Sequence, residues 1–196
     1  MWRSERRAPR AGRRAAAAGL AAALLVLAGC ASTPPSRPVA LDVGQREWTG
    51  RFSVTLDSSV PGERQDTAVG RFSLVAAGAP GARALDLELV SPFGQTIATG
   101  RREPGGQATL RLSDGRRLEA DSLDALLRRA LGYPMPIERL PDWLDDRFES
   151  VLQRDAQGAP RLAEDSGWRI EREPRRWALQ RPHEGARLRV VLVLDR

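Results

Sequence analysis

Apolar and polar residues alternate with a period of two along much of the chain after Trp48. In the first such stretch, Phe52, Val54 and Leu56 alternate with polar residues. This alternation predicts β-strands that turn one face toward an apolar interior and the other toward water. The pattern recurs, and predicts further strands, at residues 72–74, 85–89, 110–112, 168–170, 177–179 and 188–194.

Short sequences rich in glycine and proline separate these stretches. A polar loop from Asp57 to Asp66 has Pro61-Gly62 as its turn. Because strands joined by short turns pair as antiparallel neighbours, we expect one antiparallel sheet of roughly ten strands. Further turns are expected at Gly78-Ala79-Pro80-Gly81, Pro104-Gly105-Gly106 and Asp114-Gly115.

A helical insert is expected to interrupt the strands after Asp121. That residue can cap a helix that ends at Gly132 and Pro134, and a shorter helix follows, with Pro141 in its first turn or dividing it. Each helix has one apolar side, so both are expected to lie against the apolar face of the sheet. The apolar sides carry Leu123, Leu126, Leu127 and Ala130 in the first helix and Ile137, Leu140, Trp143 and Leu144 in the second.

The first 29 residues have the layout of a secretory signal peptide. A charged region up to Arg14 precedes an apolar run from Ala15 to Ala28, which is shorter than the ~20 residues that a spanning helix needs. The tetrad Leu27-Ala28-Gly29-Cys30 resembles a bacterial lipobox, in which signal peptidase II cleaves before the cysteine and acyl chains are attached. The sequence therefore predicts lipidation of Cys30. The alternative is a small-residue cleavage site that leaves an unpaired thiol.

The chain after the leader divides into a tether and a domain. Residues 30–45 are rich in proline and predict an extended tether, and residues 46–196 form the patterned domain. Ala31 stands after the cysteine where proteobacterial lipoproteins retained at the inner membrane have aspartate, which favours the outer membrane.

The net charge of +6 does not indicate a nucleic-acid-binding protein. Residues 1–29 carry six arginines and one glutamate, so they hold +5 of that charge and the rest of the chain only +1. The basic excess therefore belongs to the leader rather than to a binding face, and we expect no nucleic-acid partner.

The residue types present favour a binding protein over an enzyme. His183 is the only histidine and Cys30 the only cysteine, so a metal site of several histidines and cysteines cannot be assembled. Asp142, Asp145 and Asp146 could serve glycoside hydrolysis, but the favoured interpretation is a solvated face of a short helix. We expect no metal and no cofactor, and a tethered hydrolase that uses Asp142 is kept as an alternative.

Several short motifs follow one another in a characteristic order. Residues 87–96 combine a strand, the turn Ser91-Pro92-Phe93-Gly94 and the start of a second strand. Gly50-Arg51-Phe52-Ser53 precedes them, and residues 131–137 and Gly167-Trp168 follow. This order between Trp48 and Leu194, together with the lipobox, resembles the LolB family of outer-membrane lipoprotein receptors.

The resemblance implies both a fold and a function. The fold would be mainly β, an open and curved antiparallel sheet like an unclosed barrel of the LolA/LolB type, with a helical lid over an apolar cavity. The function would be to accept lipoproteins from the periplasmic carrier LolA and place them in the inner leaflet of the outer membrane. The protein would be a monomer, anchored by lipid and facing the periplasm. The alternatives are a structural or assembly lipoprotein without lipid cargo, and a sheet whose leucines pack a dry core.

The resemblance also implies site residues. Phe93 stands between Pro92 and Gly94, where the family has a leucine on a protruding loop linked to delivery into the membrane, so we expect Phe93 to enter the leaflet. The alternative is an aromatic ring folded back onto its hairpin. Acyl chains of the cargo would occupy the cavity, whose candidate walls are Phe52, Phe72, Leu87, Leu89, Leu126 and Trp143.

Overall fold

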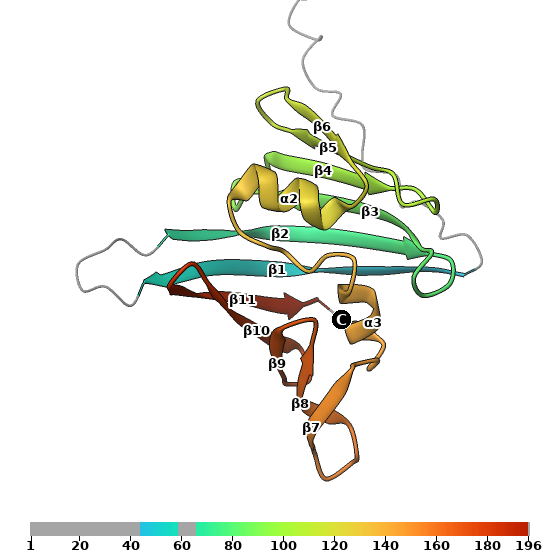
Figure 1. Ribbon diagram of the computed structural model, residues 1–196, viewed down its shortest axis with the longest axis vertical. Helices are drawn as coiled ribbons and strands as arrows, with labels where there is room; N and C mark the ends of the chain where they lie inside the picture. Colours follow the sequence, from blue (N-terminus) through green and yellow to red (C-terminus); the bar gives the residue numbers. More distant parts are fainter. Residues whose placement is uncertain (1–43, 59–65, 196) are drawn as a thin grey trace, which may run out of the picture. The chain divides into compact units, whose positions relative to one another are not determined.

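The computed structural model describes residues 44–58 and 66–195, in which eleven strands form one antiparallel sheet (Figure 1). The expectation of a mainly β fold built on an unclosed antiparallel sheet is confirmed, with one strand more than the rough count. The strands are β1 (Gln45–Ser58), β2 (Asp66–Ala77), β3 (Ala84–Val90), β4 (Thr96–Arg102), β5 (Ala108–Leu112), β6 (Arg117–Ala120), β7 (Ser150–Arg154), β8 (Pro160–Asp165), β9 (Trp168–Arg172), β10 (Arg176–His183) and β11 (Ala186–Leu194).

The order of the strands keeps the sheet open. Across the sheet it is β6-β5-β4-β3-β2-β1-β11-β10-β9-β8-β7, so the first and last strands of the domain are central neighbours. The two edges, β6 and β7, are consecutive in the sequence. The chain between them, residues 121–149, must therefore cross the width of the sheet, and Figure 1 shows it doing so. We call residues 121–149 the crossing segment.

The crossing segment carries two helices, α2 (Leu123–Leu131) and α3 (Leu140–Leu144). The expected cap at Asp121 is wrong, because Ser122 occupies the N-cap and its hydroxyl accepts a hydrogen bond of 3.1 Å from the Ala125 amide. The expected end at Gly132 is confirmed, since this residue has a φ of 84° that glycine adopts without strain. Pro141 lies in the first turn of α3, as expected.

Two repeated Gly-Arg-Phe-Ser sequences lie opposite each other in β1 and β2. In this register Gly50 faces Phe72, and Phe52 faces Gly70. A Cβ atom added to Gly70 would lie 2.8 Å from the Phe52 ring, and one added to Gly50 would lie 3.0 Å from the Phe72 ring. Each ring therefore covers the glycine of the other strand, which explains why the same pattern occurs twice.

The strand β7 shows no alternation of apolar and polar residues. Four of its five residues are exposed and only Val151 is half-buried, so no apolar periodicity marks it. It is an edge strand that pairs only with β8. Its position therefore comes from pairing with a neighbour rather than from burial of its own side chains.

Several expectations fall outside the described residues. They concern the signal peptide at residues 1–29, lipidation at Cys30, nearly all of the tether at residues 30–45, and the Pro61-Gly62 turn. The strand β1 begins at Gln45, one residue before the expected start of the domain. Among the described residues, no helix is both long and apolar enough to cross a membrane.

Candidate functional site

An apolar pocket of about 90 Å³ lies between the sheet and the crossing segment. Aromatic and aliphatic side chains from the central strands form one side of it, and residues of the crossing segment form the other. The sheet contributes Phe52, Phe72, Leu87, Leu89 and Leu192, and the crossing segment contributes Leu127, Leu131, Tyr133, Met135, Ile137 and Leu140.

Four of the six residues expected to form cavity walls line this pocket, namely Phe52, Phe72, Leu87 and Leu89. The other two, Leu126 and Trp143, are buried in the hydrophobic core but are not part of the pocket lining. Leu126 and its neighbour Leu127 both belong to the apolar stripe of α2, and the sequence does not show which of them faces the pocket. Helix periodicity predicts which residues of the helix are buried. Which of those residues face the pocket depends on how the helix packs on the sheet.

The small volume shows that most of the apolar face is packed. An apolar cavity of about 150 Å³ accepts one benzene molecule, and this pocket is smaller. The face is filled by α2, which packs on β4, β5 and β6 through Leu123, Leu126 and Leu127. The structure is therefore largely a packed core with a remaining pocket, which would admit a larger apolar group only if part of the crossing segment moved.

Phe93 lies at the tip of the connection between β3 and β4. The Gly94 amide donates a hydrogen bond of 3.0 Å to the Ser91 carbonyl, and the Ser91 amide donates one of 2.8 Å to the Gln95 carbonyl. Pro92 suits the second position of such a turn, and Gly94 takes the left-handed conformation with a φ of 83°. The turn leaves Phe93 91% exposed, so its ring does not fold back onto the hairpin.

The N-terminal end of α2 is tied to the chain before α3 by a reciprocal pair of carboxylates. The Leu123 amide donates a hydrogen bond of 2.7 Å to Glu138, and the Glu138 amide donates one of 3.1 Å to Asp124. Arg102 of β4 lies 3.2 Å from the Glu138 carboxylate. The pKa of Asp124 is raised to about 7, mainly by burial and also by the nearby charge of Glu138, while the hydrogen bond from the Glu138 amide acts to lower it.

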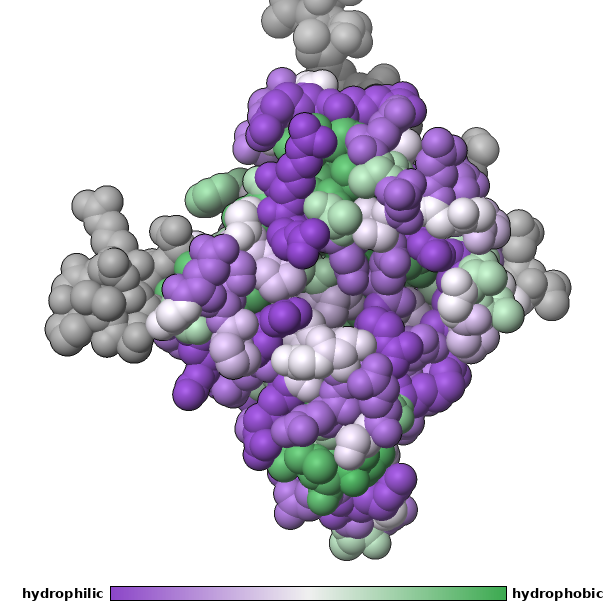
Figure 2. Space-filling view, viewed as in Figure 1, coloured by the Kyte–Doolittle hydropathy of each residue, from purple (hydrophilic) through white to green (hydrophobic). Residues whose placement is uncertain are grey.

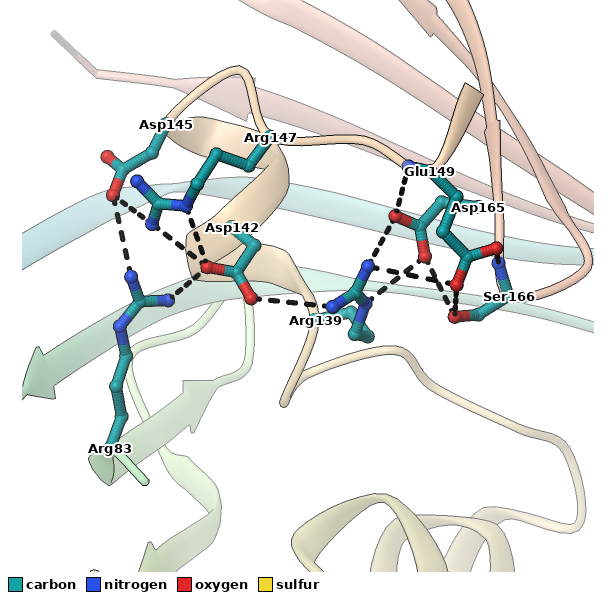
Figure 3. A network of polar contacts seen from close by, with 8 residues as sticks. All are labelled: Arg83, Arg139, Asp142, Asp145, Arg147, Glu149, Asp165 and Ser166. Atoms are coloured by element: carbon teal, nitrogen blue, oxygen red, sulfur yellow. Dashed lines mark hydrogen bonds and ion pairs between the residues drawn. The ribbon is translucent and has the colours of Figure 1, made fainter. Parts of the chain in front are cut away.

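The helix α3 carries a cluster of ion pairs (Figure 3). Asp142, which is only 7% exposed, accepts hydrogen bonds of 2.8 Å from Arg83 and 2.9 Å from Arg147. Arg147 also binds Asp145 at 2.7 Å, and Arg46 of β1 pairs with Asp145 as well. The hydrogen bonds to these two carboxylates raise the pKa of Arg147. The expected solvated face is therefore wrong for Asp142, whose charge is buried among arginines.

The cluster continues to the turn between β8 and β9. Arg139 binds Asp165 through two hydrogen bonds of 3.1 and 2.5 Å, and the Glu149 amide donates one of 3.0 Å to the same carboxylate. Burial acts to raise the pKa of Asp165, but the bonds from Arg139 and Ser166 outweigh it, so that pKa lies below its ordinary value. These contacts attach α3 to β8 on one side, while Arg83 attaches it to the start of β3 on the other.

His183 ends β10 and is half-buried, and its Nε2 atom lies 3.2 Å from the carbonyl oxygen of Gly132 at the end of α2. The contact joins the β10–β11 hairpin to the C-terminal end of α2. No sequence signal pointed to this contact, because the two residues are far apart in the chain.

The sequence matches a known protein family. The family model described as "Outer membrane lipoprotein LolB" matches residues 45–191. The chain is 39% identical over 190 residues to the outer-membrane lipoprotein LolB of Bordetella petrii, covering 91% of this chain and 90% of the relative. It is 38% identical to that of Bordetella pertussis, covering 87% of each, and 35% identical to that of Ralstonia nicotianae, covering 77% of this chain and 73% of the relative.

Proposed function

The chain belongs to the LolB family of outer-membrane lipoproteins, and on that premise we propose that it receives lipoproteins and inserts them into the outer membrane. The donor would be a LolA-type carrier in the periplasm, and the acceptor would be the inner leaflet of the outer membrane. Cys30 would anchor the protein to that membrane as a monomer facing the periplasm. The observation that carries the proposal is the family match over residues 45–191, which includes all the residues that line the apolar pocket except Leu192.

The pocket supplies the chemistry that acyl chains require. Its lining is almost wholly apolar, and Tyr133 is its only residue with a polar side-chain group. Each buried methylene contributes about 0.8 kcal/mol, but carrier, receptor and bilayer all offer apolar surroundings, so most of that free energy cancels between them. Small differences in affinity would then direct the cargo toward the membrane without a nucleotide.

Cargo binding would need a wider pocket than the 90 Å³ of this conformation. The sheet side is held by continuous strand pairing, so the crossing segment is the part that would move. We propose that displacement of α2 enlarges the pocket and that its return expels the acyl chains.

A transfer experiment tests the function. The soluble Cys30→Ala protein would be mixed with a carrier loaded with an acylated lipoprotein, and the cargo would be followed by co-purification. Cargo should pass from the carrier to this protein. Failure of transfer, with no apolar probe entering the domain, would leave only a structural lipoprotein.

The exposed ring of Phe93 supports a role in release. We expect Phe93→Glu to accept cargo from the carrier but to lose insertion into vesicles, because a carboxylate is costly to place in the acyl region. Leu152→Glu is a matched control, since Leu152 is 49% exposed and lies on the edge strand β7. Normal insertion by the Phe93→Glu protein would contradict the role.

A further inference from the structure

Leu131 joins the apolar pocket to the surface. It is the last residue of α2, it lines the pocket, and it is 36% exposed. The other pocket leucines of the crossing segment, Leu127 and Leu140, are at most 3% exposed. The pocket therefore reaches the surface at the C-terminal end of α2.

The Phe93 turn lies at this same end of the pocket. Leu89 and Ile97, which flank the turn in β3 and β4, both line the pocket together with Leu131. Figure 1 shows the C-terminal end of α2 over the part of the sheet where β3 passes into β4. The exposed Leu131 therefore lies at the end of the pocket that the strands flanking the Phe93 turn also line.

Apolar exposure by itself does not mark such an opening. Figure 2 shows apolar surface over β7 and β8 as well, and Leu152 of β7 is more exposed than Leu131. Leu152, however, lies on the opposite edge of the sheet from the strands on which α2 packs, and it lines no part of the pocket. The opening beside Leu131 is distinguished by its continuity with the pocket.

Charge at the opening favours a phospholipid surface. Arg128 and Arg129 occupy the last turn of α2, three and two residues before Leu131, and both are exposed. Cations beside an apolar side chain are the combination that binds an anionic leaflet, where phosphates meet the arginines and the acyl region takes the apolar group.

We propose that the C-terminal end of α2 is a second membrane contact, in which Leu131 enters an anionic phospholipid leaflet while Arg128 and Arg129 bind its phosphates. This inference rests on the proposed function and extends it from the Phe93 turn to the helix that covers the pocket. With membrane contacts beside its opening, the pocket opens directly onto the leaflet, and acyl chains leave it without crossing water.

A fluorescent label tests the contact at Leu131. Cys30 is the only cysteine, so Leu131→Cys in the Cys30→Ala protein offers one thiol for an environment-sensitive nitrobenzoxadiazole label. The emission should shift to the blue and rise with vesicles of phosphatidylethanolamine and phosphatidylglycerol, and rise less with pure phosphatidylcholine. The same label at Leu152→Cys should not respond. Unchanged emission at position 131 would overturn the proposal.

Substitutions give the complementary measurement. Leu131→Glu should weaken sedimentation with the anionic vesicles by about tenfold, since burial of a leucine side chain contributes on that order. Arg128→Glu combined with Arg129→Glu should remove the preference for anionic lipid, and Leu152→Glu should bind as the parent protein does. Unfolding midpoints within the error of the parent would show that the variants fold.

The same variants separate this inference from the proposed function. A parent protein that takes no cargo from the carrier refutes the function, whatever the vesicles show. A protein carrying Arg128→Glu and Arg129→Glu that binds anionic vesicles as the parent does refutes the membrane contact, and loss of cargo acceptance in that protein would assign this end of α2 to the carrier. Loss of the preference for anionic vesicles with cargo acceptance intact supports the contact, because neither arginine lines the pocket.

Discussion

The helix α3 and the C-terminal end of α2 belong to the same crossing segment but are held to the sheet in different ways. Buried carboxylates and arginines fasten α3, with Asp142 bound to Arg83 and Arg147. The end of α2 presents exposed Leu131 and meets the β10–β11 hairpin through a single contact between the His183 ring and the Gly132 carbonyl. The difference indicates that α3 is the fixed part of the crossing segment and the end of α2 the part that can move.

The two kinds of attachment differ in the free energy that is lost when one partner is removed. A buried ion pair adds little net stability over an apolar pair, but removal of one partner leaves a charge without compensation and costs several kcal/mol. A neutral hydrogen bond contributes only about 1 kcal/mol. Opening at α3 would therefore separate charges, whereas opening at the end of α2 would break weak polar contacts beside water.

The largest effect is expected from Asp142→Ala at the α3 end. The Arg83 side chain is only 11% exposed and would lose its shortest carboxylate contact, keeping Asp145 at 3.7 Å. We expect the free energy of unfolding to fall by about 3 kcal/mol, measured by urea denaturation. The control Glu119→Ala removes a carboxylate from an exposed pair with Arg117 and should cost less than about 1 kcal/mol. Equal losses in the two variants would end the distinction between a fixed and a movable end.

A pH-dependent effect is expected at the N-terminal end of α2. The pKa of Asp124 is raised from 3.8 to about 7, so between these values the folded protein binds more protons at this group than the unfolded chain. Its contribution therefore lowers the free energy of unfolding as the pH rises from about 4 to 7. The charged groups that face it are Glu138, whose charge raises the pKa of Asp124, and Arg102, whose charge lowers it.

Asp124→Asn should remove this part of the pH dependence, as seen in urea midpoints measured at several pH values. Asp114→Asn is the control, because the pKa of the exposed Asp114 is lowered by its hydrogen bonds with Arg116. The control should leave the decline between pH 4 and 7 in place. An Asp124→Asn protein with the parent's slope would contradict the raised pKa of Asp124.

The smallest change in stability is expected from His183→Ala at the movable end. The Gly132 carbonyl would lose a partner at 3.2 Å, which should cost about 1 kcal/mol. Hydrogen exchange should quicken at the amides in the last turn of α2 while those of α3 stay protected. Arg154→Ala, which removes a similar bond to the Gly158 carbonyl, should quicken exchange only in its own turn. Faster exchange throughout α3 after His183→Ala would contradict the independence of the two ends.

Much of the fold could be predicted from local patterns. Alternation around Phe52 and Leu87 marks strands because a pleated strand turns successive side chains to opposite faces. Gly132 marks the end of α2 because its left-handed conformation suits glycine. The exposure of Phe93 follows from the turn residues on either side of it, which leave the ring no neighbouring surface within the turn.

The candidate site was less predictable. Leu127 lines the pocket and Leu126 does not, although both lie on the buried side of one helix. The three aspartates near Trp143 suggested a solvated surface, yet Asp142 is buried by arginines that come from other parts of the chain. These ion pairs join residues that are far apart in the chain, so no residue spacing in the sequence predicts them.

The sequence by itself determined the strands that alternate, the turns and the apolar side of α2, because each depends on neighbours a few residues away. The tertiary structure alone decided that consecutive strands β6 and β7 lie at opposite edges of the sheet. That placement stretches the crossing segment over the apolar face and creates the pocket beneath it. It also brings buried charges to α3 and leaves Leu131 exposed at the pocket opening, because both depend on which distant surfaces meet when the chain folds.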